Sequence, residues 1–506
     1  MNKVVTLLMF KRIFFAILSV TPFLAVPLSA ANAGNTDSYA SAQWSADMAS
    51  GTLPIMHINT ENSQPIVDKE NYVSAGLWIE IPDKCDDKQL GLSSADNPVK
   101  LGIRGRGNSS WDNNDKKPYK IKFDSKTELL GLPKHKHFVL LACGNLYTDD
   151  WLGQAVGKEL ANMVGLGWNP RYYPVELVLN GRYDGIYFLY ESIKIDSNRL
   201  DIFEQPEENT DPTTIPYGWL VEIDNYADEF QVMIPDGETW MRVTHKSPEI
   251  LSDMQRQWLI DDFTAITETI HGDNRENWTE HIDPASLAKY FIVIEVMVDY
   301  DGFNGSVYMH KDMGDSRWKL GPMWDNNSAA RSEPSDWTMN ILPEWSRWKI
   351  IPQIFNTKNF KDAFNKEWKA FYPKLGALKT FILDLAKKCE AAELANQKRW
   401  DADYVINENF ALRFYEYIER RAKWINDNRE NAGIESTEIP DAEVMAHEYI
   451  TLAGTKVSGR PIPGMYLLRT TYSDGSTTTK KWPSNDAVPL CVIKQPLKAG
   501  VMAQES

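Results

Sequence analysis

The chain has 506 residues, of which 43% are hydrophobic and 25% are charged, so we expect packed globular cores rather than a disordered protein. Its 54 Lys and Arg against 70 Asp and Glu give a net charge of −16. This balance argues against general nucleic-acid binding and disfavours a peripheral binder of anionic lipid, because no surplus of cations exists to displace counterions. The 18 Trp, 21 Tyr and 19 Phe fit either a large aromatic core or surfaces that stack on sugars.

The first residues have the features of a signal peptide, which we place at residues 1–33. Three cations precede the apolar stretch 13–30, and Ala31–Ala33 supplies small residues at the spacing that a signal peptidase accepts. An uncleaved membrane anchor is the alternative, because the stretch is close to the roughly 18 residues that a spanning helix needs. Pro22 and Pro27 favour cleavage. We therefore expect an exported chain that is periplasmic, on the cell surface or secreted, without a stable membrane anchor.

After a polar linker at residues 34–52, the first half of the chain predicts strands. Short apolar or alternating segments occur at 54–59, 75–81, 99–103, 119–123, 137–141, 174–179 and 185–190. A helix is expected at 148–165, and Asn180-Gly181 predicts the turn of a β-hairpin. This part of the chain therefore predicts a β-rich lobe, which we bound at residues 53–203.

The second half of the chain predicts mainly helices. An acidic, proline-containing loop at 204–216 and a strand at 218–223 precede them. Apolar residues then recur every three or four positions at 250–271, 284–298, 358–371, 375–395 and 408–430. We therefore predict the α+β class, with a helical lobe at 204–431 and a tail at 432–506 that holds a hairpin of strands 465–471 and 477–482.

A basic segment stands out in this acidic chain. Arg104 and Arg106 alternate with glycines after a predicted strand, and Lys120 and Lys122 lie on the next one. Glycines let backbone amides turn toward an anion, and Arg and Lys supply full charges for phosphate or carboxylate. The alternative is a tight turn with solvated arginines, with the lysines on the outer face of a strand.

An acidic pair of segments lies in the second half. Asp301 follows a strongly apolar helix, and Asp325 follows two strand-like pieces, 307–311 and 318–323, that a turn joins. Such a hairpin would bring Asp325 back beside Asp301. Oxygen ligands placed in this way suit a hard cation that carries a nucleotide, or a carboxylate pair for acid/base work. An acidic turn with a buried aspartate capping a loop is the alternative.

Six motifs in series resemble those of the spore-coat protein H (CotH) kinase-like family over about residues 53–431. They are IRGRGNSSW, KKPYKIKF, GQAVGKELANMVGL, VELVLNGRYDGIYFLYESIKI, DYDGFNGSVYMHKD and KLGPMWDNN. The resemblance implies an atypical protein-kinase-like bilobal fold, with a small β-rich lobe, a larger helical lobe, and ATP with Mg²⁺ or Mn²⁺ between them. Characterised relatives of this kind phosphorylate proteins, and others are surface adhesins.

By this resemblance, Asp301 would be the catalytic base and Asp325 the principal metal ligand. Lys120 or Lys122 would hold the ATP phosphates, and Glu159 on the following helix could pair with that lysine. Only one of the lysines would face inward, and Tyr119, Ile121 and Phe123 are the alternative occupants of that face.

Three further residues complete the phosphate and adenine side. Arg104 and Arg106 are additional phosphate ligands by the same resemblance. Glu191, at the end of the predicted hairpin, matches a recurrent glutamate in the segment against which adenine could lie, with a structural salt bridge as the alternative.

The chain departs from the kinase pattern at one position. Ser306 stands five residues after Asp301, where kinases carry an Asn that ligates a second metal. Catalysis with one metal, recruitment of Asn304 or Asn327, and loss of activity are all open. In the Trp-Asp-Asn-Asn motif, Asn327 is the position that matches the family's polar residue.

The leading hypothesis is an exported kinase that transfers the ATP γ-phosphate to a hydroxyl of a protein in the cell envelope or extracellular space. The main alternative is a non-catalytic surface-binding or adhesin module that retains the fold. A carbohydrate-active enzyme is a third, because of the Trp-rich composition. The hairpin region of the tail resembles the C-terminal sorting strands of gliding-type secretion cargo, with an ordinary accessory hairpin as the alternative.

Overall fold

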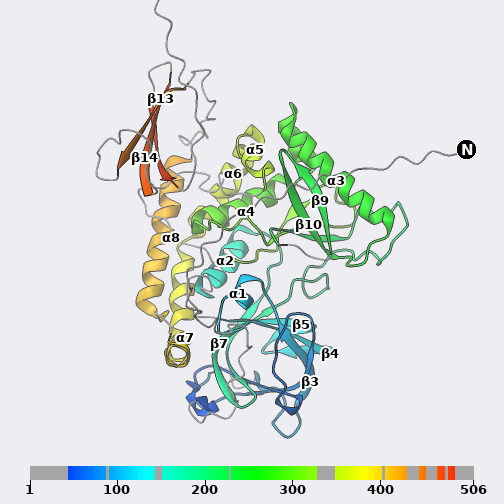
Figure 1. The fold of residues 1–506 in the computed structure, drawn as a ribbon. Helices are drawn as coiled ribbons and strands as arrows, with labels where there is room; N and C mark the ends of the chain where they lie inside the picture. The colour runs from blue at the N-terminus through cyan, green and yellow to red at the C-terminus, as the bar shows by residue number, and fades with distance from the viewer. Residues whose placement is uncertain are drawn as a thin grey trace, which may run out of the picture. The chain divides into compact units, whose positions relative to one another are not determined.

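The protein mixes helices and strands and has a β-rich N-terminal region (Figure 1). The computed structural model describes residues 44–86, 90–142, 151–226, 230–326, 348–401 and 405–429, and the backbone of 444–451, 464–472 and 477–484. These residues form two compact units. Unit 1 draws on Met1–Leu152, Pro170–Ile193 and Thr380–Leu412, and unit 2 on Gly153–Asn169, Lys194–Lys379 and Arg413–Ser506. The predicted signal peptide lies outside the described residues.

Unit 1 is built on a closed β-barrel. Its strands follow the order β1-β2-β3-β4-β5-β7-β6, and β1 closes the barrel by pairing parallel to β6, whereas the other neighbours are antiparallel. The strand bounds are β1 Ile55–Thr60, β2 Val73–Glu80, β3 Val99–Gly105, β4 Tyr119–Leu129, β5 Leu132–Ala142, β6 Tyr172–Leu179 and β7 Arg182–Glu191. Closure leaves no unpaired strand edge for another chain to pair with.

Strand alternation decides which side chains enter the barrel. Tyr119, Ile121 and Phe123 of β4 belong to its buried core, whereas Lys120 is half-buried and Lys122 is exposed. Because successive side chains of a strand point to opposite faces, both lysines lie on the outer surface of the barrel. The structure therefore agrees with the alternative in which the three apolar residues take the inward face.

The β6–β7 connection is the predicted hairpin. Asn180 and Gly181 have φ values of 51° and 76°, the left-handed conformation that a two-residue hairpin turn requires. The Asn180 side chain also accepts a hydrogen bond from the Thr60 amide at 2.8 Å. The turn thereby fixes the end of β1 as well as its own hairpin.

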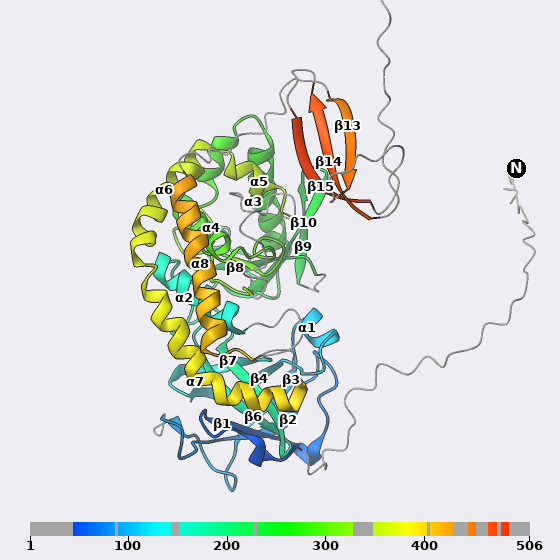
Figure 2. The same cartoon turned by 90° about the vertical axis from the view of Figure 1, so that its left-hand side faces the viewer.

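Helix α7 (Ala377–Trp400) contributes its residues from Thr380 onward to unit 1 (Figure 2). The fully buried Lys116 donates to the Ile186 carbonyl at 2.5 Å and to Asn396 Oδ1 at 2.7 Å. Trp400 Nε1 donates to the Asp184 carbonyl at 2.8 Å. These contacts dock the helix on β7, so unit 1 is discontinuous in sequence and differs from a contiguous lobe at 53–203.

Unit 2 contains a five-stranded sheet in the order β12-β11-β8-β10-β9. Its strands are β8 Trp219–Asp224, β9 Gln231–Asp236, β10 Thr239–Ser247, β11 Val307–Lys311 and β12 Lys319–Leu320. The prediction of a mainly helical lobe at 204–431 therefore missed β9 and β10. In these strands Met233 and Trp240 are apolar but exposed and Asp236 is polar but buried, so the sequence pattern does not follow the burial that pairing produces.

The longer helices lie close to their predicted bounds. The longer ones are α2 Trp151–Val164, α3 Asp253–His271, α4 Pro284–Met297, α6 Lys358–Phe371 and α8 Glu408–Asn428, with short α1 Ser109–Asp112 and α5 Ile350–Phe355. Ser252 begins α3 with a reciprocal capping box to Gln255. Asp283 caps α4 by accepting from the Ser286 amide at 2.8 Å. The 3.6-residue period and the caps together explain the accurate boundaries.

Aromatic residues form much of the interior of unit 2. The centre of the Phe291 ring lies 4.4 Å from that of Phe355 and 5.2 Å from that of Phe360. These ring contacts join α4 to α5 and α6. Trp219, Trp278, Trp318 and Trp368 are all fully buried. These tryptophans therefore serve packing rather than sugar stacking.

The C-terminal region forms a three-stranded antiparallel sheet from β13 Val444–Thr451, β14 Gly464–Tyr472 and β15 Thr477–Ser484. β14 and β15 occupy the place of the predicted hairpin, and β13 is an additional strand. Within the described ranges, no helix has the length and apolar character needed to cross a membrane.

Candidate functional site

The site in unit 2 begins where α4 ends. Val298 adopts a left-handed conformation with φ of 52° that turns the chain out of the helix. Asp299 is fully buried, whereas Asp301, two residues later, is exposed. Asp301 donates its backbone amide to Asp299 Oδ1 at 3.3 Å. The turn therefore divides two carboxylates between the interior and the surface.

Packing fixes the loop that carries Asp301. A Cβ added to Gly302 would lie 2.4 Å from a methyl carbon of Ile294, so only glycine fits against α4 there. The Gly302 carbonyl accepts a hydrogen bond from the buried Tyr290 hydroxyl at 3.2 Å. The sequence thus places the Asp301 side chain on a loop that is held tightly against its own helix.

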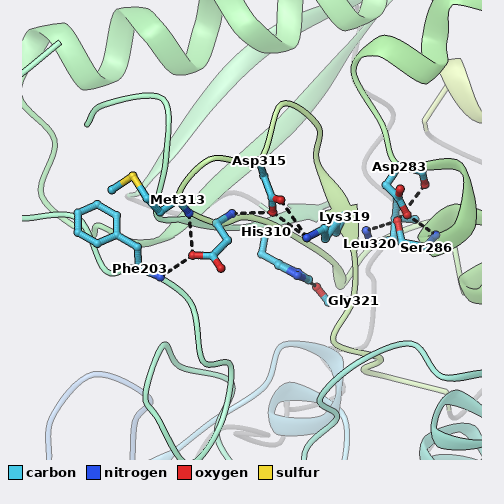
Figure 3. A network of polar contacts seen from close by, with 10 residues as sticks. Phe203, Asp283, Ser286, His310, Met313, Asp315, Lys319, Leu320 and Gly321 are labelled. Atoms are coloured by element: carbon cyan, nitrogen blue, oxygen red, sulfur yellow. Dashed lines mark hydrogen bonds and ion pairs between the residues drawn. The ribbon is translucent and has the colours of Figure 1, made fainter. Parts of the chain in front are cut away.

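The β11–β12 hairpin lies between this loop and Asp325 in the sequence, and Figure 3 shows the polar contacts that hold it. Asp315 accepts from Lys319 Nζ and from the Asp312 amide, which closes the hairpin turn. Ser286 Oγ of α4 accepts from the Leu320 amide at 3.1 Å, so α4 also holds the returning strand. His310 contacts the Gly321 carbonyl at 3.0 Å. The chain is thereby directed back toward the beginning of the loop.

Asp325 contacts the segment that follows Asp301, while its proximity to Asp301 itself stays a prediction. Its backbone is left-handed, with φ of 64°. One carboxylate oxygen accepts from Ser306 Oγ at 3.3 Å and the other from Gln154 Nε2 of α2 at 3.2 Å. A non-glycine residue in this conformation is uncommon and persists where its surroundings hold it, which makes Asp325 a candidate functional residue.

Asn326 links Asp325 to Asp299. The Asn326 side chain is fully buried, and its Nδ2 donates to Asp299 Oδ2 at 3.2 Å. Burial raises the pKa of Asp299 to about 7, the charges of Asp301 and Asp325 add to the rise, and the hydrogen bonds from Asn326 and the Asp301 amide oppose it. Asp299 and Asp325 form what we call the carboxylate pair.

Helix α2 lies against this pair and contributes Lys158, which is not among the residues predicted from the sequence. Lys158 is 2% exposed, and its Nζ lies 5.2 Å from the centre of the Trp324 ring. Burial lowers the pKa of Lys158 to about 7, against the opposing effects of Asp325 and Asp299. A Cβ at Gly157 would lie 2.4 Å from Asn326 Oδ1, so α2 approaches as closely as a glycine allows.

A signal for Lys158 is present in the helix motif. Gln154, Gly157 and Lys158 are spaced i, i+3 and i+4, which places them on one helix face. The family resemblance points instead to the neighbouring Glu159, which is half-buried. Glu159 belongs to unit 2 and Lys120 and Lys122 belong to unit 1, so their pairing stays a prediction.

The predicted phosphate ligands of unit 1 lie on the barrel exterior. Arg104 faces Lys120 across the β3–β4 ladder, and the guanidinium carbon of Arg104 lies 5.0 Å from the centre of the Tyr72 ring. Lys122 Nζ lies 5.9 Å from the centre of the same ring. Arg106, which follows β3, is half-buried. The structure therefore gathers Arg104, Lys120 and Lys122 on one face of unit 1.

Glu191 forms a salt bridge within unit 1. Its buried carboxylate accepts from Arg171 Nη2 at 2.8 Å and from Arg171 Nε at 2.9 Å. It also accepts from the Arg171 backbone amide at 2.9 Å. Such a bidentate ion pair fixes the position of the end of β7, which favours a structural salt bridge over adenine binding for Glu191.

The oxygen atoms of unit 2 suit a divalent cation. The Asp325 carboxylate is half-buried, and Asn304 Oδ1 and Gln154 Oε1 are buried acceptors without a hydrogen-bond partner among the described residues. Carboxylate and amide oxygens are the ligands that Mg²⁺ prefers. The donor set therefore fits such an ion, although in the described ranges no three His, Cys, Asp or Glu side chains are gathered to hold one. Asn327 lies outside those ranges.

Comparison with known proteins gives the family. The model of the CotH kinase protein family matches residues 103–425, so the chain belongs to the CotH kinase family. This match covers the barrel from Ile103 in β3 onward as well as the loop of Asp301, Ser306 and Asp325. A search of curated proteins returned no match.

Proposed function

We propose that the protein is an exported CotH-type kinase that transfers the γ-phosphoryl group of ATP to hydroxyl groups of proteins in the cell envelope or extracellular space. The observation that carries the proposal is a contact between the two family motifs. Ser306, five residues after the exposed Asp301, donates a hydrogen bond to the carboxylate of Asp325, whose backbone is left-handed. We further propose that units 1 and 2 correspond to the small and large lobes of an atypical kinase-like fold.

In the proposed reaction, Asp301 is the base. Its exposed carboxylate would accept the proton of the acceptor hydroxyl while that oxygen forms its bond to the γ-phosphorus. The bond from the γ-phosphorus to the bridging oxygen breaks, and ADP leaves with that oxygen. A divalent cation, Mg²⁺ or Mn²⁺, would neutralise the phosphate charge. Asp325 would hold that ion, with Asn304 as an additional oxygen ligand.

The hydrogen bond from Ser306 to Asp325 supports a role for Ser306 that differs from that of a kinase Asn. A hydroxyl that donates to the Asp325 carboxylate holds that side chain in one orientation. We therefore propose that Ser306 positions the principal metal ligand and that transfer proceeds with one protein-held metal. Arg104, Arg106, Lys120 and Lys122 remain the proposed phosphate ligands of unit 1.

Phosphotransfer with the mature chain tests the proposal. The protein would be incubated with γ-labelled ATP, Mg²⁺ or Mn²⁺, and extracted envelope proteins. Asp325→Ala should abolish the label, and Asp261→Ala, which removes an exposed aspartate of α3, serves as the matched control. Absence of transfer by the wild-type chain to itself or to envelope proteins, or transfer that survives Asp325→Ala, would overturn the proposed activity.

A non-catalytic binding module is the second candidate. Two observations favour it: Ser306 replaces the metal-binding Asn of kinases, and Lys158 places a protein cation beside the carboxylate pair. Thermal denaturation with nucleotide separates the two functions. A ligand at 100 times its Kd adds about 2.7 kcal/mol to the stability of a native state that binds it. No shift with any nucleotide would favour the binding module.

A further inference from the structure

The face of α2 that meets the carboxylate pair combines close approach with an internal positive charge. Gln154 donates to Asp325, Gly157 allows the helix to contact Asn326, and Lys158 lies over Trp324. These three residues touch three consecutive positions of the Asp325 segment. The position of Lys158 is thus fixed by the contacts of Gln154 and Gly157, which precede it in the helix, and by its own contact with Trp324.

The surroundings of Lys158 explain how a lysine is held there. A buried ammonium group is costly unless other charges or rings compensate it. Here the Trp324 ring lies 5.2 Å from Nζ, within the range in which an aromatic face attracts a cation. The negative charges of Asp325 and Asp299 act on the same group. The lysine and the carboxylate pair therefore compensate each other in part inside unit 2, while burial keeps the pKa of Lys158 below its ordinary value.

This arrangement places a protein cation in the field that would attract a metal ion. A divalent cation held by Asp325 must displace part of that compensation, and the ammonium group of Lys158 repels it. Lys158 has no such conflict with an anion, because an ammonium group and a phosphate attract each other.

We propose that Lys158 is the resident counter-ion of the carboxylate pair and weakens the binding of a free divalent cation to Asp325. The inference rests on the proposed metal role of Asp325. A metal ion would then bind favourably mainly together with a polyphosphate, because the anion attracts the Lys158 ammonium group and offsets its repulsion of the metal. Lys158 is a positioning and selectivity residue in this scheme, and it acts before any phosphoryl transfer.

Binding of Mn²⁺ alone to the nucleotide-free, full mature chain tests this inference. The free ion would be counted by electron paramagnetic resonance during a titration. Lys158→Met keeps the length of the side chain over Trp324 and removes the charge, so it should bind Mn²⁺ at least tenfold more tightly than the wild type. Lys158→Arg keeps the charge and should bind as weakly as the wild type.

Two controls make the result specific. Lys289→Met removes one positive charge from α4, where Lys289 lies 3.9 Å from Glu367, and should leave Mn²⁺ affinity within twofold of the wild type. Adding Asp325→Asn to Lys158→Met should abolish the gain. Near-ultraviolet circular dichroism would show that each variant is folded, and Lys158→Gln replaces Lys158→Met if the latter is not.

The inference is overturned if the charge-removing variant binds Mn²⁺ no more tightly than the wild type, or if the gain survives Asp325→Asn. Its failure is distinguishable from failure of the proposed kinase activity. A gain in Mn²⁺ affinity without phosphotransfer would retain the counter-ion role and reject the kinase, whereas phosphotransfer without the gain would do the opposite.

Discussion

The barrel face of unit 1 and the acidic site of unit 2 handle their charges in opposite ways. Unit 1 keeps Arg104, Lys120 and Lys122 on the outer face of a barrel whose interior is apolar. Unit 2 buries Asp299 and Lys158 in its interior beside a loop that exposes Asp301. Exposed charges are screened by water and ions, whereas buried charges must be compensated by specific partners. Substitutions should therefore have small structural effects in the first set and large effects in the second.

The largest effect on activity is expected at Asp301, which is an exposed charge within unit 2 and so can be compared with the buried charges of the same unit. Because Asp301 is exposed, Asp301→Asn should lower the rate of phosphotransfer by about a thousandfold or more while leaving thermal stability unchanged. The rate of label transfer and the melting temperature would be measured on the same preparation. Comparable transfer by wild type and variant would remove Asp301 from the role of base.

A buried ion pair in unit 2 provides the largest expected effect on stability. Arg421 of α8 and Glu295 of α4 are both fully buried, and Arg421 Nη2 lies 2.5 Å from Glu295 Oε2. Arg421→Met leaves the glutamate without its partner and should destabilise the protein by about 3–5 kcal/mol, as measured by urea denaturation.

The matched control lies two residues away on the same helix. Lys423 forms an exposed pair with Asp427, so Lys423→Met should hardly change the urea midpoint. Equal effects of the two substitutions would contradict the distinction between buried and exposed charges. A double change of Arg421→Met with Glu295→Leu should recover much of the loss, because it removes the uncompensated charge.

A pH-dependent effect of intermediate size is expected at Asp224, at the end of β8. Burial raises the pKa of Asp224 to about 6 from its ordinary 3.8, Glu222 adds to the rise, and Lys246 opposes it. The fold therefore favours the protonated carboxyl. This contribution to stability is fully present below pH 3.8 and is lost as the pH rises through about 6.

Asp224→Asn should remove that dependence. The variant should equal the wild type near pH 4 and exceed it in stability at pH 8, by on the order of 1–3 kcal/mol. Thermal melts at both pH values provide the measurement. If the difference in stability between wild type and variant is the same at pH 8 as at pH 4, ionisation of Asp224 does not destabilise the fold.

The sequence predicts much of the helical framework because its signals are local. Spaced apolar residues and the caps Ser252 and Asp283 give the bounds of α3 and α4 closely. The Asn180-Gly181 turn is equally local. By contrast, β9 and β10 have only a weak pattern of their own, and the docking of α7 on β7 depends on buried contacts such as Lys116 with Asn396.

The residues of the site also divide into those that local sequence signals predict and those that depend on tertiary packing. Asp301 and Asp325 belong to motifs with recognisable spacing, and the structure joins their segments through Ser306. Lys158 and Asp299 were missed because their importance comes from burial, which places a helix residue beside a carboxylate distant in sequence. A charged residue on the buried face of an amphipathic helix is the one local sign that was present. Asn327 remains a prediction.

The smallest effects are expected on the barrel exterior, where the phosphate-ligand prediction can be tested without disturbing the fold. Lys120 and Lys122 lie on the outer face of β4, so Lys120→Met and Lys122→Met should each change the free energy of unfolding by no more than about 0.5 kcal/mol. If one of them holds an ATP phosphate, that variant alone should bind the nucleotide more weakly. Calorimetric titration with a non-hydrolysable ATP analogue would measure this, and unchanged affinity in both variants would leave the barrel lysines as solvated residues. If a lysine variant does bind the nucleotide more weakly, Arg104→Met should weaken nucleotide binding as well, because Arg104 faces Lys120 across the β3–β4 ladder.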